Sequence, residues 1–152
     1  MADLRSNRLD PRWIIAAVAA VVLVIASLAL LGRGDDGNEV ITRTSDQMPS
    51  ELPPGLVPEG ATEVRGQVAS RGGEWLSVSV EFLVNQGNRD EIAQAAEQAA
   101  ERAGWAFYER VYDTTTMILR WNDAEGSALT MTLRTEDTTV RAGAVAVRAT
   151  TT

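Results

Sequence analysis

The side chains that most often carry out covalent or metal chemistry are missing from this sequence. Its 152 residues include no histidine and no cysteine, and all 14 basic residues are arginine. Serines such as Ser77, Ser79 and Ser127 therefore have no histidine or lysine to accept their proton during nucleophilic attack. The lack of cysteine also excludes disulfides and thiolate metal sites. We expect a protein without catalytic residues, cofactor or metal.

Carboxylates are the remaining groups that could act as acids, bases or cation ligands. In the C-terminal half they fall on predicted turns or on a polar helix surface, where a solvated charge is the usual role. The run 122–126, NDAEG, offers oxygen ligands to a weakly bound cation, but a hairpin turn needs the same residue types. We therefore expect a turn at this run.

Arginine and tyrosine gather on one predicted sheet face and form the best candidate binding surface. Period-two alternation after residue 104 turns one set of apolar residues inward, although Glu109 falls on that inward side unless it lies at a sheet edge. Amphipathic aromatics beside guanidinium groups suit a protein partner, an anionic wall polymer or a glycan. The outward face holds Tyr108, Arg110, Tyr112, Ile118, Arg120, Thr130, Thr132 and Arg134, and its tyrosines and arginines are the candidate binding residues.

A hairpin and a helix are predicted ahead of this surface. Residues 74–84, EWLSVSVEFLV, alternate strictly, and Gly72–Gly73 before them is a two-residue hairpin signal that makes 62–71 the partner strand. A helix follows, with Asn88 or Asp90 as its N-cap and Gly104 at its C-terminal end. Its predicted apolar stripe is Ile92, Ala96, Ala99 and Ala103.

Four further strands are predicted between residues 105 and 149, at hairpin spacing. The resulting order is β-β-α-β-β-β-β. Because the helix has one apolar stripe and the strands alternate, the sequence predicts an α+β domain with one helix packed on an antiparallel sheet.

A continuous apolar block precedes this domain. Residues 13–31 are uncharged and would span about 28 Å as a helix, close to the thickness of the hydrocarbon core of a bilayer. Arg5, Arg8 and Arg12 lie before the block, which predicts a cytoplasmic N-terminus. The competing interpretation is a signal peptide cleaved after Ala29, but the block exceeds the usual length of a secretory apolar region.

These features predict four regions along the chain. Residues 1–12 form a cytoplasmic tail and 13–31 a transmembrane helix that contacts the lipid bilayer. Residues 32–60 contain four of the five prolines and six acids, which predicts a flexible acidic linker. Residues 61–152 form the extracytoplasmic domain.

A resemblance to known proteins adds to this interpretation. Residues 80–120 contain a strand, a capped helix that ends in Ala103-Gly104-Trp105, and a strand that begins after the tryptophan. This run resembles uncharacterised, membrane-anchored extracytoplasmic proteins of GC-rich bacteria, actinobacteria especially. The resemblance covers about a third of the chain and implies a location rather than an activity.

The expected function is therefore binding or assembly outside the cell membrane. A single-pass, non-catalytic module would present a sheet face to an envelope protein or a cell-wall polymer. The net charge of −7 repels nucleic acid, which we do not expect as a partner. The alternative is a secreted hydrolase or cation-dependent enzyme released by cleavage after Ala29.

Overall fold

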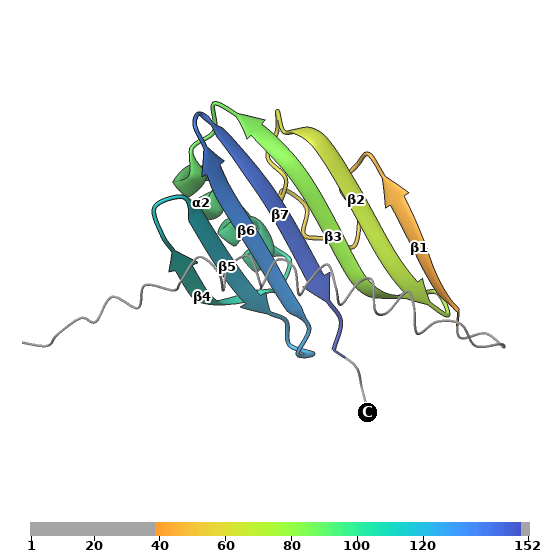
Figure 1. The fold of residues 1–152 in the computed structure, drawn as a ribbon. Helices are drawn as coiled ribbons and strands as arrows, with labels where there is room; N and C mark the ends of the chain where they lie inside the picture. Colours follow the sequence, from red (N-terminus) through yellow and green to blue (C-terminus); the bar gives the residue numbers. More distant parts are fainter. Residues whose placement is uncertain (1–38, 150–152) are drawn as a thin grey trace, which may run out of the picture. The chain divides into compact units, whose positions relative to one another are not determined.

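The structure is a computed structural model that describes residues 39–149. Over these residues the chain forms seven strands and one helix (Figure 1). In chain order they are β1 (Val40–Ser45), β2 (Thr62–Arg71), β3 (Glu74–Asn85), α2 (Arg89–Arg102), β4 (Ala106–Tyr112), β5 (Thr116–Asn122), β6 (Ala128–Glu136) and β7 (Thr139–Val147).

All seven strands belong to one sheet, in the order β1-β2-β3-β7-β6-β5-β4. After β3 the helix α2 carries the chain to the far edge, and β4 to β7 return by hairpins until β7 pairs with β3 (Figure 1). This antiparallel pairing runs from Ser77 opposite Val147 to Asn85 opposite Thr139. The pairing joins the two halves of the chain into one continuous sheet.

The predicted fold class is wrong. The sequence predicts an α+β domain behind a transmembrane helix and a linker, whereas the described chain is mostly β, a seven-stranded antiparallel sheet with a single helix. Among residues 39–149 no helix is long and apolar enough to cross a membrane. The block at 13–31 and the tail at 1–12 lie outside the described residues.

Local sequence signals explain the hairpin and the helix. Gly72 and Gly73 both have positive φ, 58° and 84°, as a tight turn between β2 and β3 requires. At the helix start, the Oδ1 atom of Asn88 accepts hydrogen bonds from the N–H groups of Asp90 (2.9 Å) and Glu91 (3.4 Å). The buried side chains of α2 are Ile92, Ala93, Ala96, Ala99 and Ala100, whereas the expected Ala103 is exposed.

One face of the sheet carries the hydrophobic core. Val80, Leu119, Trp121 and Leu133 are fully buried on this face, and α2 packs against it over β4, β5 and β6. Small alanines along the buried stripe of α2 let the helix approach the sheet closely. The helix is too short to cover the whole face, so a second element is needed over β2 and β3.

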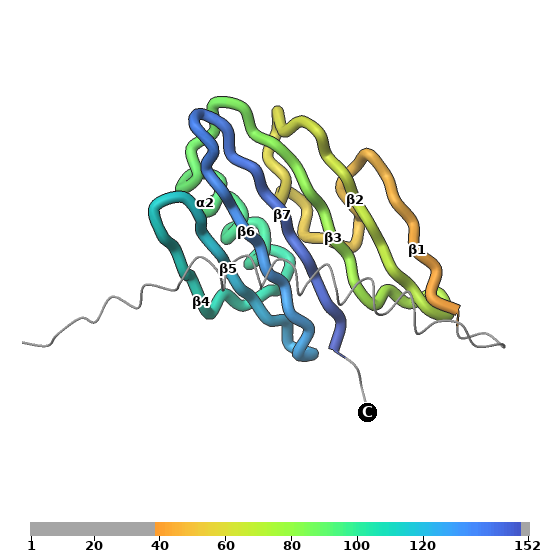
Figure 2. The backbone as a smooth tube through the Cα atoms, viewed as in Figure 1, coloured from red at the N-terminus to blue at the C-terminus, as the bar shows by residue number. Residues whose placement is uncertain are grey.

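The segment 46–61 is that second element, on the same side of the sheet as α2 (Figure 2). Leu52 and Leu56 are each only 1% exposed and belong to the core. Three turns, each closed by a hydrogen bond to a proline carbonyl, fold the segment onto the sheet. The proline-rich composition therefore shapes a compact cover.

The prediction of a flexible linker over 32–60 is consequently wrong for residues 40–60. The compact unit begins at Ile41, with β1 added to the sheet before the proline-rich segment. Prolines were expected to keep this region extended, but Leu52 and Leu56 bury enough apolar surface to hold it against the sheet. Residues 32–38 lie outside the described chain.

Candidate functional site

The face of the sheet opposite α2 and the segment 46–61 is the candidate binding surface, and we call it the open face. Because side chains alternate along each strand and paired residues share a face, the cross-strand pairs define its members. Small or polar side chains fill the centre, where Ser79 lies opposite Val145 and Val145 opposite Thr130. The central residues are Ser77, Ser79, Gly143, Val145, Thr130 and Thr132.

Two of the five predicted binding residues, Arg110 and Tyr112, do not lie on the open face. Between Phe107 and Glu109 the register of β4 against β5 shifts by one residue, at Tyr108. A bulge of this kind moves every following side chain to the opposite face. Arg110 therefore lies opposite Leu119 and Tyr112 opposite Met117, both on the core side. Tyr108 occupies the bulge itself and is 56% exposed.

Arg110 is held at the rim of the core side. Its Nη2 atom donates to Glu97 of α2, and its guanidinium carbon lies 6.0 Å from the ring centre of Phe107. The strand β4 is thereby tied to the helix. Arg110 was predicted to share a binding surface with Arg120 and Arg134, but it lies on the other side of the sheet.

Arg120 and Arg134 do lie on the open face, and both have acidic neighbours. Arg120 forms an ion pair with Glu109, which the bulge moves from the predicted inward side to the open face. Arg134 lies opposite Arg141, and each is within 4 Å of the carboxylate of Glu136. The margins of the open face therefore carry both arginines and glutamates, and its centre carries small side chains.

Aromatic rings are absent from the paired positions of the open face among residues 39–149. Trp121 and Phe107 pack against each other on the core side, with ring centres 5.8 Å apart. A register shift after Ala69 pairs Trp75 with Ser70, and Trp75 packs against the core. Tyr108 in the bulge of the edge strand β4 is an exposed ring beside the open face.

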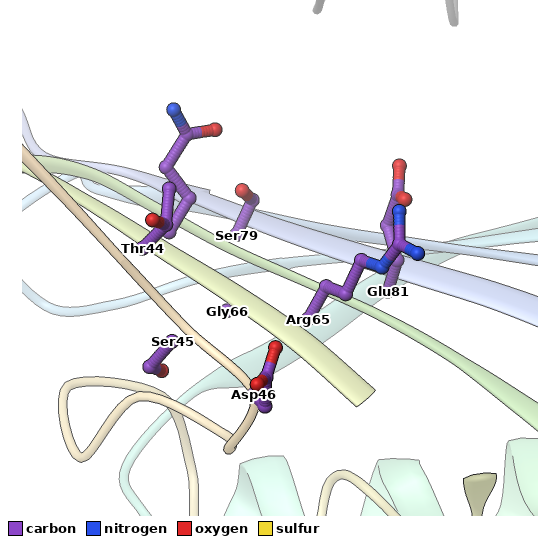
Figure 3. Close-up of a pocket in the computed structure, with 8 residues that line it drawn as sticks. Thr44, Ser45, Asp46, Arg65, Gly66, Ser79 and Glu81 are labelled. Carbon is purple, nitrogen blue, oxygen red and sulfur yellow. The ribbon is translucent and has the colours of Figure 1, made fainter. Parts of the chain in front are cut away.

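A shallow groove lies where β1 ends, at the side of the open face (Figure 3). Its volume is about 520 Å³, within the range of sites that accept small ligands or side chains. Ser79 and Glu81 of β3 point to the same side of the sheet, and Asp46 closes the groove beyond β1 (Figure 3). The lining residues are Thr44, Ser45, Asp46, Arg65, Gly66, Gln67, Ser79 and Glu81.

The groove was not predicted, because residues 32–60 have the composition of a linker. The run VITRTS at 40–45 is rich in β-branched residues, which favour strands, and could have indicated β1. No local pattern shows that the end of this strand meets Arg65 and Glu81, which come from later strands.

In the turn between β5 and β6, the carboxylate of Asp123 accepts hydrogen bonds from backbone N–H groups. Asp123 Oδ1 accepts hydrogen bonds from the N–H groups of Glu125 (2.9 Å) and Ser127 (2.7 Å), which makes the run 122–126 a turn in which the carboxylate is already engaged. Desolvation opposes ionisation of Asp123, but its backbone hydrogen bonds, that from Ser127 foremost, leave its pKa below the usual value. In the part of the chain that is described, no group of three or more acids is placed to hold a metal ion.

Comparison of the chain with protein-family models, curated proteins and solved structures finds no significant match.

Proposed function

We propose that this chain is a membrane-anchored, non-catalytic binding module whose open face contacts a partner protein outside the cell. The observation that supports this most is the open face itself, with small and polar side chains at its centre and charged side chains at its margins. The centre offers short side chains and hydroxyl groups that lie close to the backbone, from Ser79, Thr130, Thr132 and Val145. Arg120 and Arg134 lie at the margin. Such a surface suits a flat protein contact with a polar rim.

A protein partner is favoured over a glycan or wall polymer. Sugar rings present flat apolar faces that pack best against aromatic side chains, which supply large contact areas. Within the described strands the paired positions of the open face offer none of these rings, and the exposed Tyr108 lies in the bulge of the edge strand β4, away from the centre of the face. The margins carry arginine and glutamate together, so an anionic polymer would meet repulsion from Glu109 and Glu136 as well as attraction.

The apolar block 13–31 supports the membrane anchoring in this proposal. It has the length and composition of a bilayer-spanning segment, and the arginines before it favour a cytoplasmic N-terminus. Only 32–39 separate the block from β1, and eight residues can reach at most about 29 Å.

A charge placed in the centre of the open face tests the binding role. In cells that make the full chain, crosslinking followed by identification should recover one partner protein with the wild type. We expect Thr132→Glu to lower that recovery at least tenfold, because a buried carboxylate at a flat contact lacks a partner. The matched control is Thr138→Glu, on the exposed turn after β6, which should recover as much partner as the wild type. Equal recovery with both variants would exclude the open face.

N-terminal sequencing tests the anchoring. A chain that keeps its apolar block begins at Met1 or Ala2 and stays in the membrane fraction. A mature chain that begins near residue 30 would instead support the secreted alternative.

A further inference from the structure

The two edges of the sheet differ in how they are protected against pairing with another strand. Edge strands expose unpaired N–H and C=O groups, and bulges or charged side chains are common ways to block them. The edge strand β4 has both, a bulge at Tyr108 and ion pairs from Glu109 and Arg110. Its edge is therefore unsuited to a further strand.

The edge strand β1 carries fewer charges than β4, with one charged side chain where β4 has two. Five of its six residues are exposed, Ile41 to 58%, and four are Val, Ile or Thr. Its one charged side chain, Arg43, leans toward the segment 46–61, where its Nη2 atom lies 3.7 Å from Glu51 Oε1. The outer side of β1 has the composition of a strand that accepts another strand.

The surroundings of β1 are acidic. Residues 39–61 contain Glu39, Asp46, Glu51 and Glu59 but only one basic residue, Arg43, a net charge of −3. The groove at the end of β1 adds one acid, Glu81, and one base, Arg65, which lie opposite each other on β3 and β2. Within residues 39–149 Asp46 has no salt-bridge partner within 4.0 Å. The carboxylate of Asp46, farther from Arg65 than that of Glu81 in Figure 3, is the one to which a basic side chain of a partner would bind.

We infer that the edge of β1 and the groove at its end bind an extended, basic segment of a partner protein, which adds to the sheet as a further strand. The inference rests on the proposed function, since it names how the partner protein is held. Main-chain hydrogen bonds to β1 supply affinity, and an arginine or lysine beside Asp46 supplies specificity. A second copy of this chain fits less well, because it would bring a second acidic edge of net charge −3 against the first.

Site-specific photo-crosslinking in the full chain tests this inference. A photo-crosslinking residue replaces Ile41 at the β1 edge in one variant and Thr132 on the open face in another. Mass spectrometry then identifies the attached peptide in cells that make the protein. We expect adducts from position 41 to fall on one extended segment of another protein that contains arginine or lysine.

The groove is tested by reversing its charge. Asp46→Arg should lower the yield of the adduct from position 41 at least fivefold. Glu125→Arg makes the same change of charge on the exposed β5–β6 turn and should leave the yield within twofold of the wild type. An unchanged yield with Asp46→Arg would overturn the inference, as would adducts on a second copy of this chain or adducts scattered over unrelated proteins.

The two crosslinking positions separate this inference from the proposed function. Partner adducts from position 132 without any from position 41 would overturn the β1 site and leave the open face as the binding surface. A lack of adducts at both positions would overturn both proposals. Adducts from position 41 on a basic segment, without any from position 132, would support the β1 site and exclude the open face.

Discussion

Asp113 holds the turn between β4 and β5 through its carboxylate. Its Oδ1 atom accepts hydrogen bonds from the N–H groups of Thr116 (2.7 Å) and Thr115 (2.9 Å). These bonds, that from Thr116 first, lower the pKa of Asp113 below its usual value, and the nearby Arg89 adds to the effect. Arg89 also donates to the carbonyl of Asp113 (3.2 Å), so the first turn of α2 is tied to this hairpin.

The stability of the protein should depend on pH through this carboxylate. Because its pKa is lower in the folded state than in the unfolded state, ionised Asp113 stabilises the fold above about pH 4. This stabilisation is lost as the pH falls through the folded pKa. We expect Asp113→Ala to lower the free energy of unfolding by about 1 kcal/mol at pH 7, a small effect because the site is exposed to solvent.

Urea unfolding of wild type and variant between pH 7 and pH 2.5 measures this dependence. The difference should shrink as the pH falls below about 4. Glu125→Ala, an exposed acid on the next turn, is the control and should show little difference at any pH. A difference for Asp113→Ala that stays constant over the whole range would contradict the prediction.

The bulge at Tyr108 also determines which side chains of β4 share a face of the sheet. Alternation in WAFYERVY places Tyr108, Arg110 and Tyr112 together, as predicted, only if β4 is regular. The bulge at Tyr108 divides that set, and it explains why Glu109 did not fit the predicted register. Bulges depend on the partner strand as well as on the local sequence, so the pattern of one strand could not reveal this one.

At the level of elements, the segment 46–61 packs closely on β2 because residue 66 of that strand is a glycine, which has no side chain. A Cβ atom on Gly66 would lie 2.3 Å from the carbonyl oxygen of Gln47 and 2.7 Å from Cδ of Pro49. Only glycine lets the backbone of the segment approach β2 this closely. Pro49 is itself buried by the contact.

Substitution of Gly66 should therefore displace the segment from the sheet. We expect Gly66→Ala to lower the free energy of unfolding by about 2 kcal/mol, as overpacking against backbone commonly does. Gly143→Ala on the open face is the matched control, because its Cβ would lie 3.9 Å from the nearest atom. Chemical denaturation should show a change within about 0.5 kcal/mol for that control. Equal effects of the two substitutions would contradict the close approach at Gly66.

The helix and the β2–β3 hairpin could be predicted from sequence because their signals are local. Asn88 caps the helix, Gly104 ends it with φ of 89°, and the N–H of Trp105 donates back to the carbonyl of Ala100. The strand β2 occupies the predicted range 62–71. The strand β1 was not predicted, because the segment between it and its partner β2 has the composition of a linker.

At the scale of the whole molecule, residues 40–60 complete the fold. Leu52 and Leu56 cover the part of the core that α2 does not reach, and loss of one buried leucine commonly costs about 2–5 kcal/mol. Loss of both, together with β1, would remove most of the stability of a domain of this size.

Truncation tests this role directly. A chain that begins at Glu39 should unfold cooperatively on heating and show dispersed amide resonances. A chain that begins at Ala61, the domain boundary predicted from composition, should lack a cooperative transition and bind a hydrophobic dye. Cooperative unfolding of the shorter chain would show that β1 and the segment 46–61 are dispensable.

The sequence by itself determined the local features of this protein: the capped helix, the glycine hairpin, the alternating strands and the absence of catalytic histidine, cysteine and lysine. These depend on neighbours within a few positions of each other along the chain. Tertiary structure alone decided the pairing of β3 with β7, the bulge in β4, the burial of Leu52 and Leu56, and the groove beside β1. Each of these depends on which distant segment lies opposite, and a one-residue change in that pairing reverses the face on which a side chain lies.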